Sequence, residues 1–137
     1  MLSKVRRIFV EKRKGYNIEA RSLYEELKEY LGIKGLEDVR VLNRYDISGI
    51  TDEEYARARD IIFSEPPVDL VYDEVFPLNE DERVFALEYL PGQFDQRADS
   101  AAQCVQILTQ RERPDILSAK VIILKGDITD EEFEKVK

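Results

Sequence analysis

A chain of 137 residues is long enough for one domain, or for two small half-domains that share a core. Its 29 acidic and 21 basic residues give a net charge of −8, which argues against a nucleic-acid or anionic-membrane partner, because either would need a basic face. One cysteine and no histidine exclude an internal disulfide, Cys/His zinc sites and histidine-based catalytic triads.

Nothing in the chain predicts a membrane segment or an export signal. No apolar run approaches the roughly 20 residues that a membrane-spanning helix needs. The first 14 residues carry too many charges for a signal peptide. The expected location is therefore the cytoplasm.

The first part of the chain predicts a strand, a helix and a second strand. Val5 to Lys12 alternates as a strand with one wet face does, and Gly15-Tyr16-Asn17 predicts a turn with Asn17 as a helix cap. The helix should end at Gly32. Its apolar face consists of Ala20, Leu23, Leu27 and Leu31. Val39 to Tyr45 predicts the second strand.

A second helix and a third strand follow. Thr51 and Glu54 have the spacing of a capping box, which opens a helix. The helix should end at Pro66-Pro67, because proline cannot continue it. Its inward residues are expected to be Tyr55, Ala58, Ile61 and Ile62. Val68 to Phe76 is rich in β formers and predicts a strand.

The same order then starts again after a polar joint at Asn79-Glu80-Asp81-Glu82. Val84 to Leu90 predicts a strand, Pro91-Gly92 a turn, and Asp95 to Gln110 a helix. The inward face of that helix is expected to carry Ala98, Ala101, Val105 and Leu108. Ala119 to Leu124 predicts the next strand.

A repeat is the most informative pattern in the chain. Ile50-Thr51-Asp52-Glu53-Glu54-Tyr55 returns 78 positions later as Ile128-Thr129-Asp130-Glu131-Glu132-Phe133. Ala20-Arg21-Ser22 has a counterpart in Ala98-Asp99-Ser100, and Gly15 has one in Gly92. The chain is therefore predicted to contain two copies of one small α+β unit.

The two halves are expected at residues 1–78 and 79–137, the second being C-terminally truncated. Each half is predicted to have the order β-α-β-α-β, with the last two elements incomplete in the second. Helices should cover one face of mostly antiparallel sheets, in a ferredoxin-like manner. Two such units would form a pseudo-dimer within one chain, and they should share a core, because a unit of fewer than 80 residues has little core alone.

The stretch from Glu88 to Cys104 is the strongest candidate for a functional segment. Its polar residues run into a helix N-terminus, which could hold an anion or present side chains to a neighbour. The side chains available for this are Gln93, Asp95, Gln96 and Arg97. An ordinary helix cap at Asp95 or Asp99 is the competing interpretation.

Other candidates for chemistry are weaker. The acidic runs at 52–54, 80–82 and 130–132 resemble solvated helix starts and a linker rather than an acid–base pair or a metal site. Cys104 is expected to be a small packed residue, and Arg44 to pair with an acidic residue within the chain. No phosphate-binding loop, dinucleotide fingerprint or nucleophile elbow is present. The residues alone therefore favour a binding or scaffolding module over a complete enzyme.

The stretch from Glu88 to Cys104 also resembles a known family, the N-terminal domain of large single-chain phosphoribosylformylglycinamidine synthase. Further similar segments are Ile8-Phe9-Val10-Glu11-Lys12, Asn43-Arg44-Tyr45-Asp46 and Phe63-Ser64-Glu65-Pro66-Pro67-Val68. The resemblance covers essentially the whole chain. In that family the domain is a duplicated PurS-like unit, equivalent to a dimer of the separate small PurS subunit.

The resemblance implies a role in purine biosynthesis. The full-length enzyme, a ligase and glutamine amidotransferase, uses ATP, magnesium and glutamine to convert formylglycinamide ribonucleotide into its amidine. The PurS-like domain is expected to bridge the synthetase and glutaminase domains of the same polypeptide and to shape the ammonia path. The chain itself is expected to be non-catalytic and to hold no cofactor or metal. The candidate interdomain residues are Gln93, Phe94, Asp95, Gln96, Arg97, Asp99 and Ser100.

Two other interpretations stay open. A free-standing ferredoxin-like regulatory or ligand-binding module should finish its own sheet, which the truncated second copy does not. A small hydrolase using Asp95, Asp99 and Ser100 would lack a base. The open edge of the second copy invites pairing with another chain, so self-association is a further open alternative. No nucleic-acid or membrane partner is expected.

Overall fold

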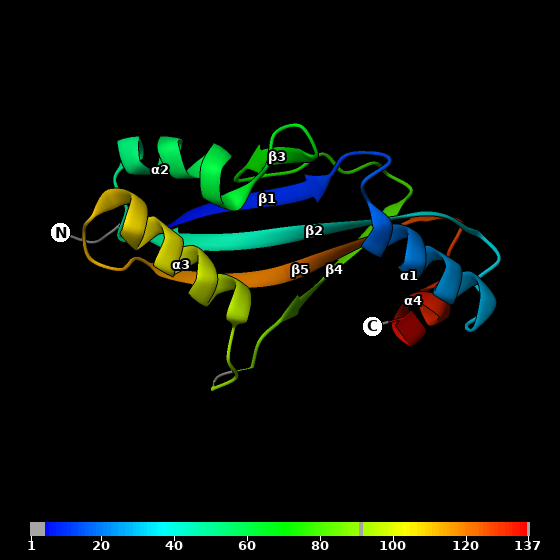
Figure 1. The fold of residues 1–137 in the computed structure, drawn as a ribbon. Coiled ribbons are helices and arrows are strands. Elements are labelled where there is room, and N and C mark those ends of the chain that lie inside the picture. The colour runs from blue at the N-terminus through cyan, green and yellow to red at the C-terminus, as the bar shows by residue number, and fades with distance from the viewer. Residues whose placement is uncertain (1–4, 91, 137) are drawn as a thin grey trace.

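The computed structural model describes residues 5–90 and 92–136. Five strands form one antiparallel sheet in the order β3-β1-β2-β5-β4, and the helices lie over one of its faces (Figure 1). The strands are β1 (Arg6–Lys12), β2 (Leu36–Ser48), β3 (Asp69–Asp73), β4 (Glu82–Glu88) and β5 (Asp115–Gly126). The helices are α1 (Ile18–Glu29), α2 (Asp52–Ala58), a π-helical turn η1 (Arg59–Phe63), α3 (Gln96–Thr109) and α4 (Asp130–Val136). The predicted α+β class is confirmed, as a single open sheet.

The two longest strands, β2 and β5, form the centre of the sheet. They pair antiparallel from Leu36 opposite Gly126 to Ser48 opposite Asp115. β1 lies outside β2 and β4 lies outside β5, while β3 is added on the far side of β1. β3 is shorter than the predicted strand because Glu74 takes a φ of 67°, which leaves the extended region.

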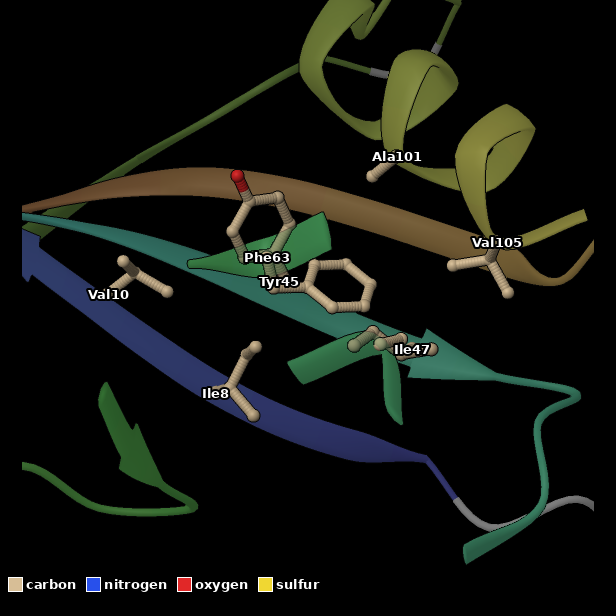
Figure 2. Close-up of a cluster of buried hydrophobic side chains, with 8 residues drawn as sticks. Ile8, Val10, Tyr45, Ile47, Phe63, Ala101 and Val105 are labelled. Atoms are coloured by element: carbon tan, nitrogen blue, oxygen red, sulfur yellow. The ribbon is translucent and has the colours of Figure 1, made fainter. Parts of the chain in front are cut away.

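Two apolar clusters lie between the sheet and the helices. The first cluster, drawn in Figure 2, joins strands β1 and β2 to η1 and α3. It consists of Ile8, Val10, Tyr45, Ile47, Ala58, Phe63, Ala101 and Val105. The second cluster lies at the other end of the sheet and consists of Leu27, Ile33, Leu36, Val39, Ile122, Leu124 and Ile128. Both clusters combine residues from before and after position 78, so neither half encloses its core alone.

The opposite face of the sheet is partly covered by the segment that joins β3 to β4. Phe76 packs edge-on against Phe9, with 4.7 Å between ring centroids. Arg40 donates two hydrogen bonds to Glu11 (2.8 and 2.9 Å) and one to the Pro77 carbonyl (2.9 Å). It also lies 3.4 Å from Glu82. Glu82 was expected in a solvated joint, but its side chain is only 2% exposed, because it lies beneath this crossing segment.

Three apolar or small side chains lie elsewhere than the helical periodicity predicts. Ile61 was expected to face inward but is exposed, while Phe63 is buried, because the wide π-helical turn rotates the positions that follow α2. Leu31 is exposed because α1 ends at Glu29. Cys104, expected to be packed, is exposed on α3. Among the helices of the described ranges, none has the length and apolar character to cross a bilayer.

Candidate functional site

The helix-bearing face is hollowed between α1 and α3, above the central strand pair. Three adjoining hollows of about 370, 300 and 580 Å³ all include Arg97 in their lining. We call their union the central groove. Its main lining residues are Asn43, Tyr45, Tyr89, Gln93, Arg97 and Lys120. The first turns of both α1 and α3 border it.

The floor of the groove is polar at its midpoint. Asn43 on β2 and Lys120 on β5 are directly opposite each other in the sheet. Lys120 forms an ion pair with Glu19 on α1. The Oδ1 atom of Asn43 is buried and accepts no hydrogen bond from the described residues. Because a buried acceptor without a donor is costly, this oxygen is the groove's clearest unmet hydrogen-bonding group.

Arg97 reaches the groove from the first turn of α3. Burial alone would lower its pKa, but the nearby Tyr45 hydroxyl and the negative charge of Glu19 raise the pKa of Arg97 overall. The guanidinium therefore stays charged, and its remaining donors face a solvent-accessible hollow.

The loop before α3 contributes Gln93 to the groove. The Gln93 backbone N–H donates to the Leu90 carbonyl (3.0 Å), and its side-chain Oε1 accepts from the Leu90 N–H (2.6 Å). These bonds close a tight turn in which Gly92 has a φ of 88°. The predicted Pro91-Gly92 turn is described only at Gly92, since Pro91 lies outside the described residues. Phe94 points outward and is 71% exposed.

Asp95 holds α3 onto the sheet. Its carboxylate accepts the Ala98 N–H (3.0 Å) as the helix N-cap. It also accepts the backbone N–H (2.7 Å) and the hydroxyl (2.6 Å) of Ser118 on β5. Of the two interpretations left open by the sequence, the structure therefore shows Asp95 as the cap, while Asp99 forms an ion pair with Arg113.

The structure brings some of the candidate residues together and separates others. Gln93, Gln96, Arg97 and Ser100 line the groove or its rim. Phe94, Asp95 and Asp99 do not line it. Sequence reasoning missed Asn43, Tyr45 and Lys120 as groove residues. The available signal was the amide of Asn43 among the alternating apolar residues Val39, Val41, Tyr45 and Ile47 of β2.

The groove offers an amide, a hydroxyl and two cationic side chains as binding groups. Within residues 5–90 and 92–136, no group of three or more Cys, Asp or Glu side chains could hold a metal ion. The acidic helix starts are engaged in ion pairs, Asp52 with Arg6 and Asp130 with Arg83. A larger hollow of about 820 Å³ lies beside α1, where β2 extends past β1. Its charged lining includes Glu11 and Arg40, which already pair with each other.

Comparison with known proteins adds no identification. No protein-family model, no curated protein and no solved structure matches the chain significantly.

Proposed function

We propose that this chain is the duplicated, PurS-like bridging domain of a large single-chain phosphoribosylformylglycinamidine synthase. The observation that carries the proposal is the position of the central groove. It lies where two halves with the same element order meet, and it is lined by Gln93 and Arg97 from the segment that resembles that family.

Internal duplication is supported by the register of the sheet. Ile8 pairs with Tyr45 across β1 and β2, and the residues 77 positions later, Phe85 and Ile122, pair across β4 and β5. The same shift applied to Asn43 gives Lys120, its partner at the centre of the sheet. A two-fold rotation through this pair therefore exchanges β1 with β4 and β2 with β5.

The apolar clusters support the same relation. The strand residues Tyr45 and Ile47 of the first cluster correspond to Ile122 and Leu124 of the second. On the helices, Val105 of the first cluster corresponds to Leu27 of the second, 78 positions earlier. The longer helix of each half therefore packs in the cluster that contains the shorter helix of the other half. In the first cluster α3 meets α2, and in the second α1 meets α4.

A side-chain arrangement on β1 also recurs on β4. Arg6 lies over the Tyr55 ring at 4.9 Å and pairs with Asp52. Arg83 lies over the Phe133 ring at 5.5 Å and lies 2.6 Å from Asp130. A contact made by three separated residues recurs by chance less readily than a capping motif does, so this recurrence favours duplication over coincidence.

In this role the chain would help to shape the ammonia path and would not itself catalyse a step. ATP, magnesium and glutamine would be handled by the synthetase and glutaminase domains of the full-length ligase. The groove would contact the synthetase domain near the ammonia path. Its Asn43 oxygen and Tyr45 hydroxyl are groups that could hydrogen-bond ammonia or a partner backbone.

Kinetics of the full-length enzyme that carries this domain would test the proposal. Arg97→Ala and Gln93→Ala should lower glutamine-dependent turnover several-fold more than turnover supplied with external ammonia, because only the first needs a sealed path. Asp99→Ala, which removes an exposed ion pair outside the groove, is the matched control. Equal loss of both activities would contradict a role in the ammonia path.

A ligand-binding module is the second candidate, favoured by the orphan oxygen of Asn43. In that case a small ligand with N–H or O–H donors would bind to the isolated chain. Thermal-shift titration with purine nucleotides and amino acids would detect such binding. Asn43→Ala should abolish the shift, while Asp99→Ala should leave it unchanged.

A further inference from the structure

The two long helices begin differently on either side of the central groove. Asp95, the residue before α3, accepts the Ala98 N–H (3.0 Å) and the backbone N–H of Ser118 on β5 (2.7 Å) with its carboxylate. The corresponding residue before α1, 78 positions earlier, is Asn17. Its side chain makes no bond to the helix and instead accepts the Gly15 N–H at 3.3 Å. The start of α1 therefore lacks the carboxylate that caps α3.

The N–H groups that bind the Asp95 carboxylate have counterparts in the first half. Ala98 corresponds to Ala20 in the uncapped first turn of α1, and Ser118 corresponds to Val41 on β2, 77 positions earlier. The Ser118 N–H points away from β2, and backbone directions alternate along an antiparallel pair, so the Val41 N–H points away from β5. The ladder between β1 and β2 ends at Leu42, so no β1 residue pairs with Val41.

A hollow of about 370 Å³, one of the three that form the central groove, lies at this place. Its lining includes Asn17, Ala20 and Val41, together with Asn43 and Arg97. Its walls come from β1, β2, α1, η1 and α3. We call it the Asn17 hollow. Its volume is within the range of small-molecule binding sites.

Two side chains of the Asn17 hollow have hydrogen-bonding capacity left over. Among the described residues, Arg97 forms no ion pair, and its counterpart on α1, Glu19, pairs with Lys120 instead. The Oδ1 atom of Asn43 is buried and accepts no hydrogen bond from the described residues. Asn43 lies two residues along β2 from Val41 on the same face, about 7 Å away, so one small molecule can reach both.

We propose that the Asn17 hollow binds a free α-amino acid, whose carboxylate takes in the first half the position that the Asp95 carboxylate takes in the second. The ligand carboxylate accepts the Ala20 and Val41 N–H groups and pairs with Arg97. The ligand ammonium group donates to the Oδ1 atom of Asn43. The inference rests on the second candidate function above, a ligand-binding module, and names the class of its ligand.

Both charged groups of the ligand are needed to satisfy the hollow. A simple anion would leave the Asn43 oxygen without a donor, and a simple amine would leave Arg97 and the two N–H groups without an acceptor. An α-amino acid carries a carboxylate and an ammonium group on one carbon atom. It therefore meets both requirements within the volume of the hollow.

Calorimetric titration of the whole chain with the free amino acids, one at a time, tests the ligand class. At least one amino acid should bind with a dissociation constant below about 1 mM. Its deaminated acid and its carboxamide should each bind at least about tenfold more weakly, because each leaves one end of the site unmatched. Equal binding of the deaminated acid would show a site for simple anions only and would overturn the inference.

Two variants test the two ends of the ligand separately. Arg97→Gln should lower the affinity for the amino acid at least about tenfold, because it removes the charge that pairs with the carboxylate. Asn43→Ala should remove the advantage of the amino acid over its deaminated acid. Asp99→Ala, which removes an exposed ion pair outside the groove, should change neither affinity. Circular dichroism of each variant shows whether the fold is retained.

Asn17→Asp tests where the carboxylate of the ligand lies. The new side chain should cap α1 as Asp95 caps α3 and raise the thermal midpoint of the ligand-free chain by about 2–5 °C. It should also compete with the ligand carboxylate and lower the affinity at least about tenfold. Ile107→Asp adds the same charge at an exposed position of α3 outside the groove and should leave the affinity unchanged.

The remaining outcomes separate this inference from the function on which it rests. Binding of purine nucleotides without binding of any amino acid at about 10 mM would keep the ligand-binding module and overturn the inference. No binding by either class would count against the module as well. An unchanged affinity in folded Asn17→Asp would place the carboxylate elsewhere and would also overturn the inference.

Discussion

Asp95 is the residue on which the position of α3 depends most directly. Asp95→Ala removes the helix cap and leaves the buried Ser118 N–H without an acceptor. These losses should lower the free energy of unfolding by about 2 kcal/mol or more. Urea unfolding would measure this as a lower midpoint with an unchanged m-value. Asp99→Ala, which removes an exposed ion pair, should cost less than about 1 kcal/mol; equal costs would contradict the role of Asp95.

Arg40 is the second residue with a large expected effect, because it neutralises two poorly exposed carboxylates. Hydrogen bonding to Glu11, and the charges of Glu11 and Glu82, raise the pKa of Arg40 despite its partial burial. Arg40→Met should cost about 3–5 kcal/mol of unfolding free energy, because it leaves Glu82 buried without its partner. Urea unfolding gives the value, with the largely exposed Arg111→Met as control. Adding Glu82→Gln to Arg40→Met should restore part of the loss, and no recovery would refute this explanation.

The residue scale also shows where sequence reasoning stops. The capping role of Asp95 needs only the next three residues, so it could be considered from the sequence. Its bonds to Ser118 could not, because they join positions 23 apart in a register that no local pattern specifies. The same holds for Asn43 and Lys120, which meet only because β2 and β5 pair as they do. These groove residues could not be predicted, because their proximity depends on the register of strands that are far apart in the sequence.

At the scale of elements, the two capping boxes provide a matched comparison. Both boxes form: the Glu54 N–H donates to the Thr51 hydroxyl and the Glu132 N–H to the Thr129 hydroxyl, each at 3.1 Å. Thr51→Ala should cost about 1–2 kcal/mol, because α2 carries buried Ala58. Thr129→Ala should cost less, because no residue of α4 is buried. Thermal or urea unfolding would compare the stabilities of the two variants. A larger loss of stability for Thr129→Ala would contradict the explanation from the burial of α2.

The capping box of α2 also predicts a pH dependence. The Thr51 backbone N–H, with the Thr51 hydroxyl and Arg111, holds the pKa of Glu54 below its usual value, although burial of the side chain acts in the opposite direction. A carboxylate with a lowered pKa stabilises the fold above its unfolded-state pKa of about 4.3, and this contribution is lost as pH falls through its folded-state pKa. Glu54→Gln should therefore be less stable than wild type above pH 5, by less than about 1 kcal/mol. The gap should close toward pH 3, and a constant gap would contradict this assignment.

The limits of sequence reasoning differ for elements. Every predicted helix and strand exists, because the capping boxes, the Gly32 stop and the apolar alternation are local signals. The π-helical turn after α2 is not local in origin. It brings Phe63 against Tyr45, with ring centroids 5.0 Å apart, and so depends on β2. The prediction that Ile61 faces inward, which assumed a regular helical period of 3.6 residues, was therefore wrong.

At the scale of the whole molecule, the interleaved clusters make the chain one cooperative unit despite its two halves. Ala101 and Val105 of the second half complete the cluster around Ile8 and Tyr45 of the first (Figure 2). The central contact is the 13-residue strand β2 against β5. A half that unfolded alone would expose both this edge and its side of each cluster, so partial unfolding is strongly disfavoured.

Equilibrium unfolding should accordingly be two-state. Far-ultraviolet circular dichroism, which follows the backbone, and tyrosine fluorescence, which reports largely on the first half, should give coincident urea transitions in the whole chain. Residues 1–78 expressed alone should remain unfolded or associate, because β2 would lose its longest pairing partner and the first cluster would lose α3. A folded, monomeric 1–78 fragment, or two separated transitions in the whole chain, would show that each half has a sufficient core of its own.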